Sequence, residues 1–287
     1  MNQFKEKAMK IVFLIAACTS VLAVALICVF LFANGIPAIG EIGIGNFLLG
    51  KLWKPSNNLF GILPMILGSI YVTGGAIILG VPIALFTSVF MARYCPRKLY
   101  PFLKSAINLL AGVPSVVYGF FGLVLIVPII HDISGRDGST MLAASVLLAI
   151  MILPTIIGVT ESALRSVPDS YYEGSLALGA THERSVFFTI VPAAKSGIVA
   201  GIVLGIGRAV GETMAVIMVA GNQARMPAGL FRGLRTLTAN IVLEMGYAAD
   251  LHREALIATG VVLFVFIMLI NFAVSLLNRR TYSGSES

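Results

Sequence analysis

The stretch from Glu161 to Gly197 reads ESALRSVPDSYYEGSLALGATHERSVFFTIVPAAKSG and separates two long apolar segments of the chain. About thirty residues of amphipathic, helix-forming sequence exceed what a simple connection between two apolar segments needs. Pro168-Asp169-Ser170 has the composition of a helix start, since Asp or Ser can cap free backbone amides. Gly179 can adopt the left-handed conformation that ends a helix. The sequence therefore predicts a short helix of about two turns inside this stretch.

The composition of the whole chain indicates a membrane protein. Of the 287 residues, 58% are hydrophobic and only 11% are charged, and the mean hydropathy is +0.96, which is unlike a soluble domain. A transmembrane helix needs roughly 20 mostly apolar residues. Six stretches meet this length, so we expect an all-α membrane protein with six transmembrane helices. They lie at about 11–33, 62–92, 105–130, 139–163, 197–220 and 255–278.

The six spans divide the chain into three expected parts. Residues 1–61 hold the N-terminal tail, the first span and the first outer loop, and residues 62–278 form the transmembrane domain. Within this domain the loop 164–196 faces the cytoplasm. Residues 279–287 form a disordered cytoplasmic tail, because TYSGSES is short, polar and terminal.

Basic residues predict the orientation of these spans. With the N-terminus taken as inside, the inner segments hold 12 of the 20 Lys and Arg residues, and Arg208 lies within a span. The outer segments hold seven, namely Lys51, Lys54, Arg136, Arg225, Arg232, Arg235 and Arg253. Because Lys and Arg accumulate in cytoplasmic loops, we expect both termini in the cytoplasm. The apolar run 11–33 exceeds the roughly 7–15 residues of a signal peptide, so we expect an uncleaved first span.

The two long outer segments differ in composition. Segment 34–61 is rich in Gly, Pro and Asn, so it is expected to be mostly loop. Trp53 between two lysines suits the lipid headgroup layer. Segment 221–254 contains LRTLTANIVLEMG, which is apolar enough to enter the protein as a partial helix. Its Arg225, Arg232 and Arg235 form either a basic vestibule that concentrates anions or an ordinary solvated loop.

Gly and Pro near the middle of several spans indicate possible helix breaks. They are Gly74-Gly75 with Pro82, Gly112 with Pro114, and Pro154. In a membrane, freed backbone groups are tolerated only inside protein or beside a wet cavity. In the third span, Ser115 and Tyr118 bring hydroxyls to such a break, where they either bond freed carbonyls or line a path.

Arg208 and Glu212 are charged residues in the middle of the fifth span. At a spacing of four they would share a helix face and pair. Intramembrane charges usually face a bundle interior or a cavity, since each costs about 2.5–3.5 kcal/mol on insertion scales. The pair either pins helix packing, or Arg208 meets an anionic substrate while Glu212 holds the guanidinium. Glu161, near the inner end of the fourth span, is expected to snorkel or to face the bundle, without a catalytic role.

The inner part of the opening stretch, Glu173 to Gly179 followed by twelve residues to Pro192, resembles the EAA loop of ABC importer permeases. This resemblance implies a short cytoplasmic helix that docks on a separate ATPase. The residues expected to carry the coupling are Glu173, Leu176, Gly179, Phe187 and Pro192, with Phe188 as a further apolar contact. The match departs from the family pattern at Gly174, Ser175 and Thr189.

Three further segments strengthen the resemblance, namely Gly112–Gly119 (GVPSVVYG), Leu153–Pro168 (LPTIIGVTESALRSVP) and Gly207–Val216 (GRAVGETMAV). From about Gly61 to Asn278 the chain is similar to the permease subunits of phosphate-specific (Pst) ABC importers. Trp53, Pro55, Arg235–Thr238 and Glu244–Tyr247 resemble the PstC type. The resemblance implies the fold of the ABC type I importer transmembrane domain, and inorganic phosphate as substrate. It implies as partners a PstA-type permease, a pair of PstB-type ATPase subunits and a PstS-type extracytoplasmic phosphate-binding protein.

Other functions have less support in the sequence. There is no GxxxxGK[ST] motif, so ATP hydrolysis would belong to a partner. Protease and hydrolase motifs are also missing from the sequence, and we expect no enzyme activity, no metal and no cofactor. The charge of +7 reflects the inner basic excess, and no nucleic acid is expected. The alternatives are a permease for another oxyanion and a secondary transporter, although no inverted repeat is evident.

Overall fold

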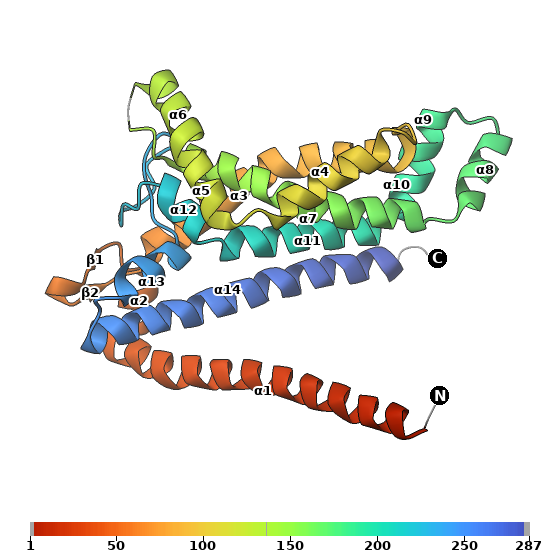
Figure 1. The fold of residues 1–287 in the computed structure, drawn as a ribbon. Coiled ribbons are helices and arrows are strands. Elements are labelled where there is room, and N and C mark those ends of the chain that lie inside the picture. Colours follow the sequence, from red (N-terminus) through yellow and green to blue (C-terminus); the bar gives the residue numbers. More distant parts are fainter. Residues whose placement is uncertain (1–2, 136, 284–287) are drawn as a thin grey trace.

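The computed structural model describes residues 3–135 and 137–283, most of which are helical (Figure 1). The first part of the chain comprises α1 (Gln3–Ile42), α2 (Ile44–Leu49), β1 (Trp53–Lys54), the 3-10 turn η1 (Pro55–Asn57), β2 (Leu59–Phe60), α3 (Leu63–Val89) and the π-helical η2 (Phe90–Tyr94). The middle comprises α4 (Tyr100–Gly112), α5 (Ser115–Phe121), the π-helical η3 (Gly122–Ile126), α6 (Val127–Ser134) and α7 (Met141–Ser166).

The remaining elements begin with the amphipathic stretch. They are α8 (Asp169–Ala177), α9 (His182–Ser185), the π-helical η4 (Val186–Ile190), α10 (Val191–Ala193), α11 (Lys195–Gly211), α12 (Met214–Val219), α13 (Leu237–Met245) and α14 (Asp250–Ser283). The two short strands pair antiparallel, with Trp53 opposite Phe60. Within residues 3–135 and 137–283, five helical segments are long and apolar enough to cross a membrane, and a sixth arises if 182–193 and 195–211 are counted together. The expected all-α architecture with six spans is confirmed.

The core of the protein lies where α3, α7 and α11 pack together. Leu147, Met151 and Ile156 of α7 are fully buried there. The seam between α7 and α11 consists of glycines spaced by four, at Gly197, Gly201 and Gly205. A Cβ on Gly205 would lie 2.6 Å from a carbon of Ile156, and one on Gly197 would collide with Ala163. Small residues at this spacing let two membrane helices approach closely.

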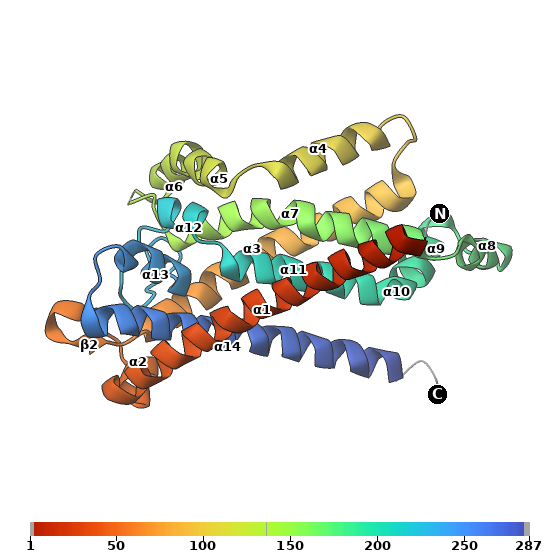
Figure 2. The ribbon, with the colours of Figure 1, turned by 60° about the horizontal axis from the view of Figure 1, so that its bottom comes forward.

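The helices α1 and α14 form a second layer beside this core. In Figure 1 the C-terminal end of α1 lies beside the start of α14, and the two helices diverge toward the N-terminus of α1. Figure 2 shows α4 flanking α7 on the side away from α14. The start of α1 and the end of α14 lie at the same end of the bundle as α8, which we call the α8 end (Figure 1). The hairpin, α2 and α13 lie at the opposite end, the α13 end.

Two expected spans are broken in the structure. The span expected at 105–130 divides into α4 and α5, because Val113 and Pro114 are extended, and a residue before proline avoids the helical conformation. The span expected at 197–220 divides after Gly211, where Glu212 is extended. Pro82 and Pro154 lie inside continuous helices, so those expected breaks are wrong.

The ends of the chain also differ from expectation. Segment 34–61 is less of a loop than its composition suggested, since α1 continues to Ile42 and is followed by α2 and the hairpin. Residues 279–283, expected to be disordered, continue α14. The rest of that tail, 284–287, lies outside the described residues, as does Arg136. The partial helix expected within 221–254 is present as α13, with Leu237 and Asn240 buried.

Candidate functional site

The first helix break is closed by a tyrosine. The turn at Val113-Pro114 leaves carbonyls of α4 without helical partners, and Tyr118 Oη donates a hydrogen bond of 2.9 Å to the Leu110 carbonyl. Of the two hydroxyls expected at this break, Tyr118 is therefore the one that bonds a freed carbonyl. Ser115 begins α5 and is half-buried. On the other side of α5, Gly119 lies against Ala215 and Met218 of α12, so the two helix breaks are packed together.

The second break overturns the expected Arg208–Glu212 pair. The helix ends at Gly211, so a spacing of four no longer places the two side chains on one face. Glu212 Oε1 instead accepts hydrogen bonds from the backbone amides of Thr213 at 3.1 Å and Ala215 at 3.3 Å. Glu212 thus satisfies amides at the start of α12, which is the role of a helix cap.

Arg208 has no carboxylate within 4 Å among the residues that the structure describes. Its Nη1 donates a hydrogen bond of 3.3 Å to Thr155 Oγ1 of α7, and its charge acts on Tyr118 of α5. Arg208 is half-buried. Arg208 is therefore a half-buried guanidinium for which the described residues give one side-chain hydrogen bond, so most of its five donors can serve another partner.

Two threonines around this site were missed by the sequence reasoning. Thr155 is the hydrogen-bond partner of Arg208, and Thr238 Oγ1 of α13 donates a hydrogen bond of 3.1 Å to the Glu212 carbonyl. Both lie in segments that had been singled out, LPTIIGV and RTLT. Their spacing to Arg208 and Glu212 carried no signal, because the contacts join different helices.

The short helix in the opening stretch is α8, and its end follows the expected pattern. Gly179 has φ +84°. The Gly179 amide donates to the Leu176 carbonyl at 2.9 Å, and the Ala180 amide donates to the Ser175 carbonyl at 3.2 Å. These two bonds define a Schellman stop, which needs a left-handed residue. The expected cap at the other end is wrong, since no side chain caps α8, and Asp169 faces Arg93 at 3.4 Å.

Two departures from the EAA pattern are in contact with each other. Ser175 Oγ lies 3.4 Å from Thr189 Oγ1 and accepts a hydrogen bond of 3.0 Å from Ser185 Oγ. These hydroxyls tie α8 to α9 and η4. The third departure, Gly174, is in the interior of α8, and a Cβ there would meet nothing within 4 Å.

Around α8 the structure exposes a set of large apolar side chains. Leu178 is 91% exposed and Phe188 is 78% exposed. Tyr171, Leu176 and Phe187 are exposed beside them, as are Glu173 and Pro192. Figure 1 shows α8 projecting from the end of the bundle. We call Tyr171, Leu176, Leu178, Phe187 and Phe188 the α8 surface. Sequence reasoning missed Leu178, its most exposed member.

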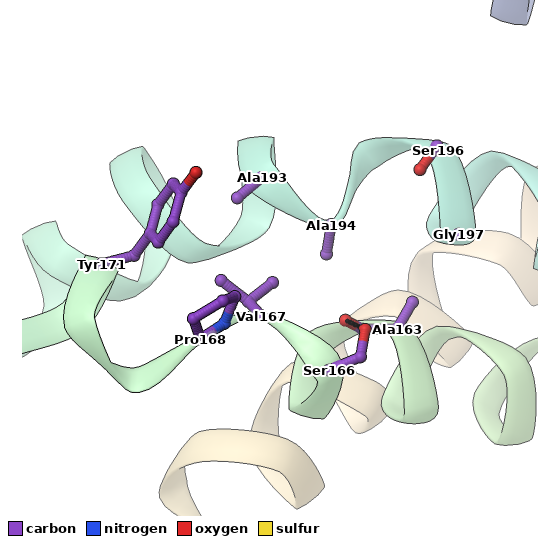
Figure 3. Close-up of a pocket in the computed structure, with 9 residues that line it drawn as sticks. All are labelled: Ala163, Ser166, Val167, Pro168, Tyr171, Ala193, Ala194, Ser196 and Gly197. Carbon is purple, nitrogen blue, oxygen red and sulfur yellow. Dashed lines mark hydrogen bonds between the residues drawn. The ribbon is translucent and has the colours of Figure 1, made fainter.

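A small cavity lies at the base of α8. It has a volume of about 250 Å³ and is lined by Ala163, Ser166, Val167, Pro168, Tyr171, Ala193, Ala194, Ser196 and Gly197. In Figure 3 the Tyr171 ring lies beside Ala193 on one side of the cavity, and the end of α7 forms the other side. At this point the segments 182–193 and 195–211 meet at an angle of 69°. The cavity thus occupies the corner where α8, α10 and α11 join the core.

A buried carboxylate lies at the α8 end of α7. Glu161 is 1% exposed and accepts hydrogen bonds from Tyr100 Oη at 2.7 Å and Arg165 Nε at 2.6 Å, and one from Lys104 Nζ. We call Glu161, Tyr100, Lys104 and Arg165 the Glu161 cluster. Of the two expectations for Glu161, facing the bundle is therefore confirmed.

A second buried carboxylate lies at the α13 end. Glu244 accepts a hydrogen bond of 2.8 Å from Trp53 Nε1, binds Arg235 and lies 2.9 Å from His252 Nε2. We call these four residues the Glu244 cluster. Trp53 is buried, so its expected place in the headgroup layer is wrong. Arg235 is part of this cluster, whereas Arg225 and Arg232 line an open pocket with Asp137 and Gln223.

Comparison with known proteins identifies the family. Residues 80–282 match the model of the binding-protein-dependent transport system inner membrane component. The chain belongs to this family. The curated relatives include the probable ABC transporter permease protein YqgH of Bacillus subtilis, which is 36% identical over 90% of this chain and 88% of its own length.

Other relatives carry a more specific name. The phosphate transport system permease protein PstC of Mesorhizobium japonicum is 34% identical over 85% of this chain and 81% of its own length. PstC 2 of Mycobacterium tuberculosis is 30% identical over 93% of this chain and 90% of its own length. What these names say about substrate applies to those proteins.

Solved structures of ABC importers share the fold. A chain of the inward-facing MetNI methionine ABC transporter superposes with a TM-score of 0.63 at 23% identity, over 80% of this chain and 99% of that chain. A chain of a bacterial alginate ABC transporter gives 0.63 at 14% identity, over 96% of both chains. The fold is that of the ABC type I importer transmembrane domain, and the chain is a multi-pass membrane protein.

Proposed function

We propose that this chain is the permease subunit of an ATP-driven ABC importer that carries inorganic phosphate across the cytoplasmic membrane. The observation that carries this proposal is Arg208, a half-buried guanidinium without a carboxylate partner among the described residues. Arg donates two parallel hydrogen bonds that match the oxygens of phosphate. The names of the PstC relatives support the same substrate.

The surroundings of Arg208 suit transport rather than storage of an anion. Arg208 is held by one hydroxyl and lies in the last turn of α11, directly before the helix break at Glu212. Conduction requires binding that is favourable enough to enter and weak enough to leave. Thr155, Ser115 and Tyr118 are the hydroxyl residues that we add to this path, and Tyr118 would have to leave the Leu110 carbonyl, because its one hydroxyl proton is donated there. We therefore propose these residues as the contacts of the anion on its path.

The α8 surface is the proposed docking site for a separate ATPase. Large apolar side chains exposed on a polar loop mark an interaction site, and Leu178 and Phe188 project there. Glu173, Leu176, Gly179, Phe187 and Pro192 belong to the same loop. The partners we propose are a PstA-type permease, two PstB-type ATPase subunits and a PstS-type extracytoplasmic phosphate-binding protein.

This assignment also proposes an orientation. The α8 end would face the cytoplasm, and both the start of α1 and the end of α14 lie at that end (Figure 1). A cysteine at Ser56, in the hairpin turn at the α13 end, should then react with an impermeant reagent in intact cells. A cysteine at Ser283 should react only after permeabilisation. Reaction of Ser283 in intact cells would reverse the orientation.

The function is tested on the complex purified from native membranes. Partners are identified by mass, and the complex is reconstituted into proteoliposomes with its binding protein. We expect uptake of radiolabelled phosphate that requires ATP at the ATPase side. An ion gradient in place of ATP should support no uptake, and uptake under those conditions would favour a secondary transporter.

Competition distinguishes phosphate from other oxyanions. Unlabelled phosphate should suppress uptake of the label, whereas sulfate and molybdate at the same concentration should not. ATP-dependent uptake of one of those anions, with no uptake of phosphate, would retain the importer and replace the substrate.

A further inference from the structure

The Glu161 cluster adds polar contacts between α4 and α7, beside the apolar packing of Leu103 and Ile107 against the core. Tyr100 and Lys104 belong to α4, whereas Glu161 and Arg165 belong to α7. Arg165 also donates a hydrogen bond of 2.9 Å to the Met91 carbonyl in η2, and its guanidinium lies 4.1 Å from the centre of the Tyr100 ring. One buried carboxylate therefore holds the end of α7 to α4 and to the turn after α3.

The same region continues into α8. Arg93 of η2 donates a hydrogen bond of 3.0 Å to the Leu164 carbonyl of α7 and pairs with Asp169, the first residue of α8. In the other direction, α4 leads to the break at Pro114, where Tyr118 bonds the Leu110 carbonyl. A continuous series of contacts thus runs from Asp169 at the start of α8 to the helix break at Pro114.

The chemistry of the cluster suits a joint that holds α4 to the end of α7. A buried carboxylate is costly unless its hydrogen bonds are satisfied, and here three side chains satisfy Glu161. Lys104 and Arg165 are long, and their side chains are 31% and 43% exposed. If one of these two cations is removed, the other still lies beside the buried carboxylate. A purely structural contact between these helices would need no ion pair, because apolar residues of similar volume pack at least as stably.

We propose that Glu161 is a positioning residue that makes α4 move with the arm formed by α7 and α8, and so transmits the state of the ATPase to the break at Pro114. This inference rests on the proposed function for its direction, from ATPase to path. Its geometric content, that α4 and the end of α7 move together through Glu161, stands apart from the identity of the substrate.

The first test measures coupling in the reconstituted complex. Lys104→Met removes the α4 side of the cluster and leaves Glu161 bonded to Tyr100 and Arg165, so the protein should assemble. We expect ATP hydrolysis to continue while phosphate uptake per ATP falls by roughly 5- to 150-fold, the range of typical coupling between sites. Glu161→Gln should lower phosphate uptake per ATP in the same way. Lys98→Met changes an exposed lysine in the turn before α4; it is the matched control and should leave the ratio unchanged.

The second test needs no substrate. Spin labels at Ser105 of α4 and Ser162 of α7, both exposed, report whether the two helices move together when ATP binds. In the otherwise unchanged complex we expect a constant distance, and in Lys104→Met a distance that shifts with ATP. Equal behaviour of the two proteins, or an unchanged uptake ratio in Lys104→Met, overturns the inference. Absence of phosphate uptake by the unmodified complex counts against the substrate alone, and the label distance still decides the role of Glu161.

Discussion

The two ends of the bundle each bury one glutamate, but they hold it with different partners. At the α8 end, Glu161 is bound by Lys104 and Arg165, whose side chains are 31% and 43% exposed. At the α13 end, Glu244 is bound by Arg235 and His252, which are 16% and 15% exposed, and by the buried Trp53. Lys104 and Arg165 are long and partly hydrated, so their charged groups also contact water. Arg235 and His252 are largely enclosed by protein, so their contacts with Glu244 are shielded from water.

We therefore interpret the Glu161 cluster as a joint that moves during transport, and the Glu244 cluster as a joint that stays in place. The Glu244 cluster joins the hairpin, α13 and α14, and Arg235 also bonds the Asn222 carbonyl and Asn240. His252 lies among the rings of Trp53, Phe60 and Tyr247. These contacts hold α13 in place, and Thr238 of α13 reaches the break at Glu212. The α13 end therefore supplies a fixed support for one side of the path.

The largest expected effect is on stability at the α13 end. Glu244→Gln removes the negative charge from a buried site and leaves Arg235 unpaired there, which costs about 3–5 kcal/mol. We expect a large fall in the melting temperature of the detergent-solubilised complex. Glu254→Gln, an exposed carboxylate on α14, is the control. Glu161→Gln should lower the melting temperature much less, and equal losses at the two ends would contradict the comparison.

Arg208 is a half-buried charge that differs from both clusters, because it has no carboxylate partner among the described residues. Arg208→Lys keeps the charge but loses the parallel pair of donors, so the loss of a charged hydrogen bond should cost about 1.5–3 kcal/mol. Phosphate uptake should fall roughly ten- to hundred-fold, with assembly and melting temperature retained. Arg253→Lys, at an exposed site on α14, is the control. Normal uptake by Arg208→Lys would move the anion contact to Ser115 and Tyr118.

Gly179 tests the α8 end without touching a charge. At φ +84° a β-branched residue is strained by about 1–3 kcal/mol, so Gly179→Val should displace the end of α8. We expect weaker binding of the ATPase or hydrolysis that no longer drives uptake, measured as phosphate per ATP. Gly174→Ala lies in the same helix with open space around its Cβ and should remain coupled. Full coupling in Gly179→Val would count against docking at α8.

The smallest expected effect concerns the hydroxyls that fasten α8. Ser175→Ala removes the acceptor for Ser185 and the contact with Thr189, at a cost of about 0.5–1.5 kcal/mol. We expect a small fall in coupling and a melting temperature close to that of the unmodified complex. In a double-mutant cycle with Thr189→Val the two losses should be less than additive. Additive losses would mean that the two departures from the EAA pattern are independent.

Local patterns of the sequence predicted the fold well. Long apolar runs must be helical in lipid because every backbone group needs a partner, and this places the spans. Pro114 predicted a break because proline restricts the residue before it, and Gly179 predicted the end of α8. Pro82 and Pro154 show the limit of this reasoning, since their helices continue and their neighbours decide the outcome.

The site was less predictable because its contacts join distant parts of the chain. The Arg208–Glu212 pair assumed an unbroken helix, and nothing in the composition of GRAVGETMAV places a stop at Gly211. Trp53 and Glu244 are 191 residues apart in sequence, so a spacing rule cannot connect them. The spacing of the glycines from Gly197 to Gly205 is the one signal within this part of the sequence that predicts close helix packing.

That glycine seam has a consequence for how the protein can change shape. The glycines of α11 lie directly against the side chains of Ala163 and Ile156 in α7, so the two helices are packed too closely to admit a larger residue between them. We therefore expect α7 and α11 to move as one rigid unit. This unit begins at the bend at Ala194, and Arg208 of α11 is hydrogen-bonded to Thr155 of α7 within it. If the protein alternates between inward and outward access, we expect its helices to bend at the breaks at Pro114 and Glu212. The Arg208 guanidinium would then move together with α7 and α11, while the helices beyond these two breaks change position around it.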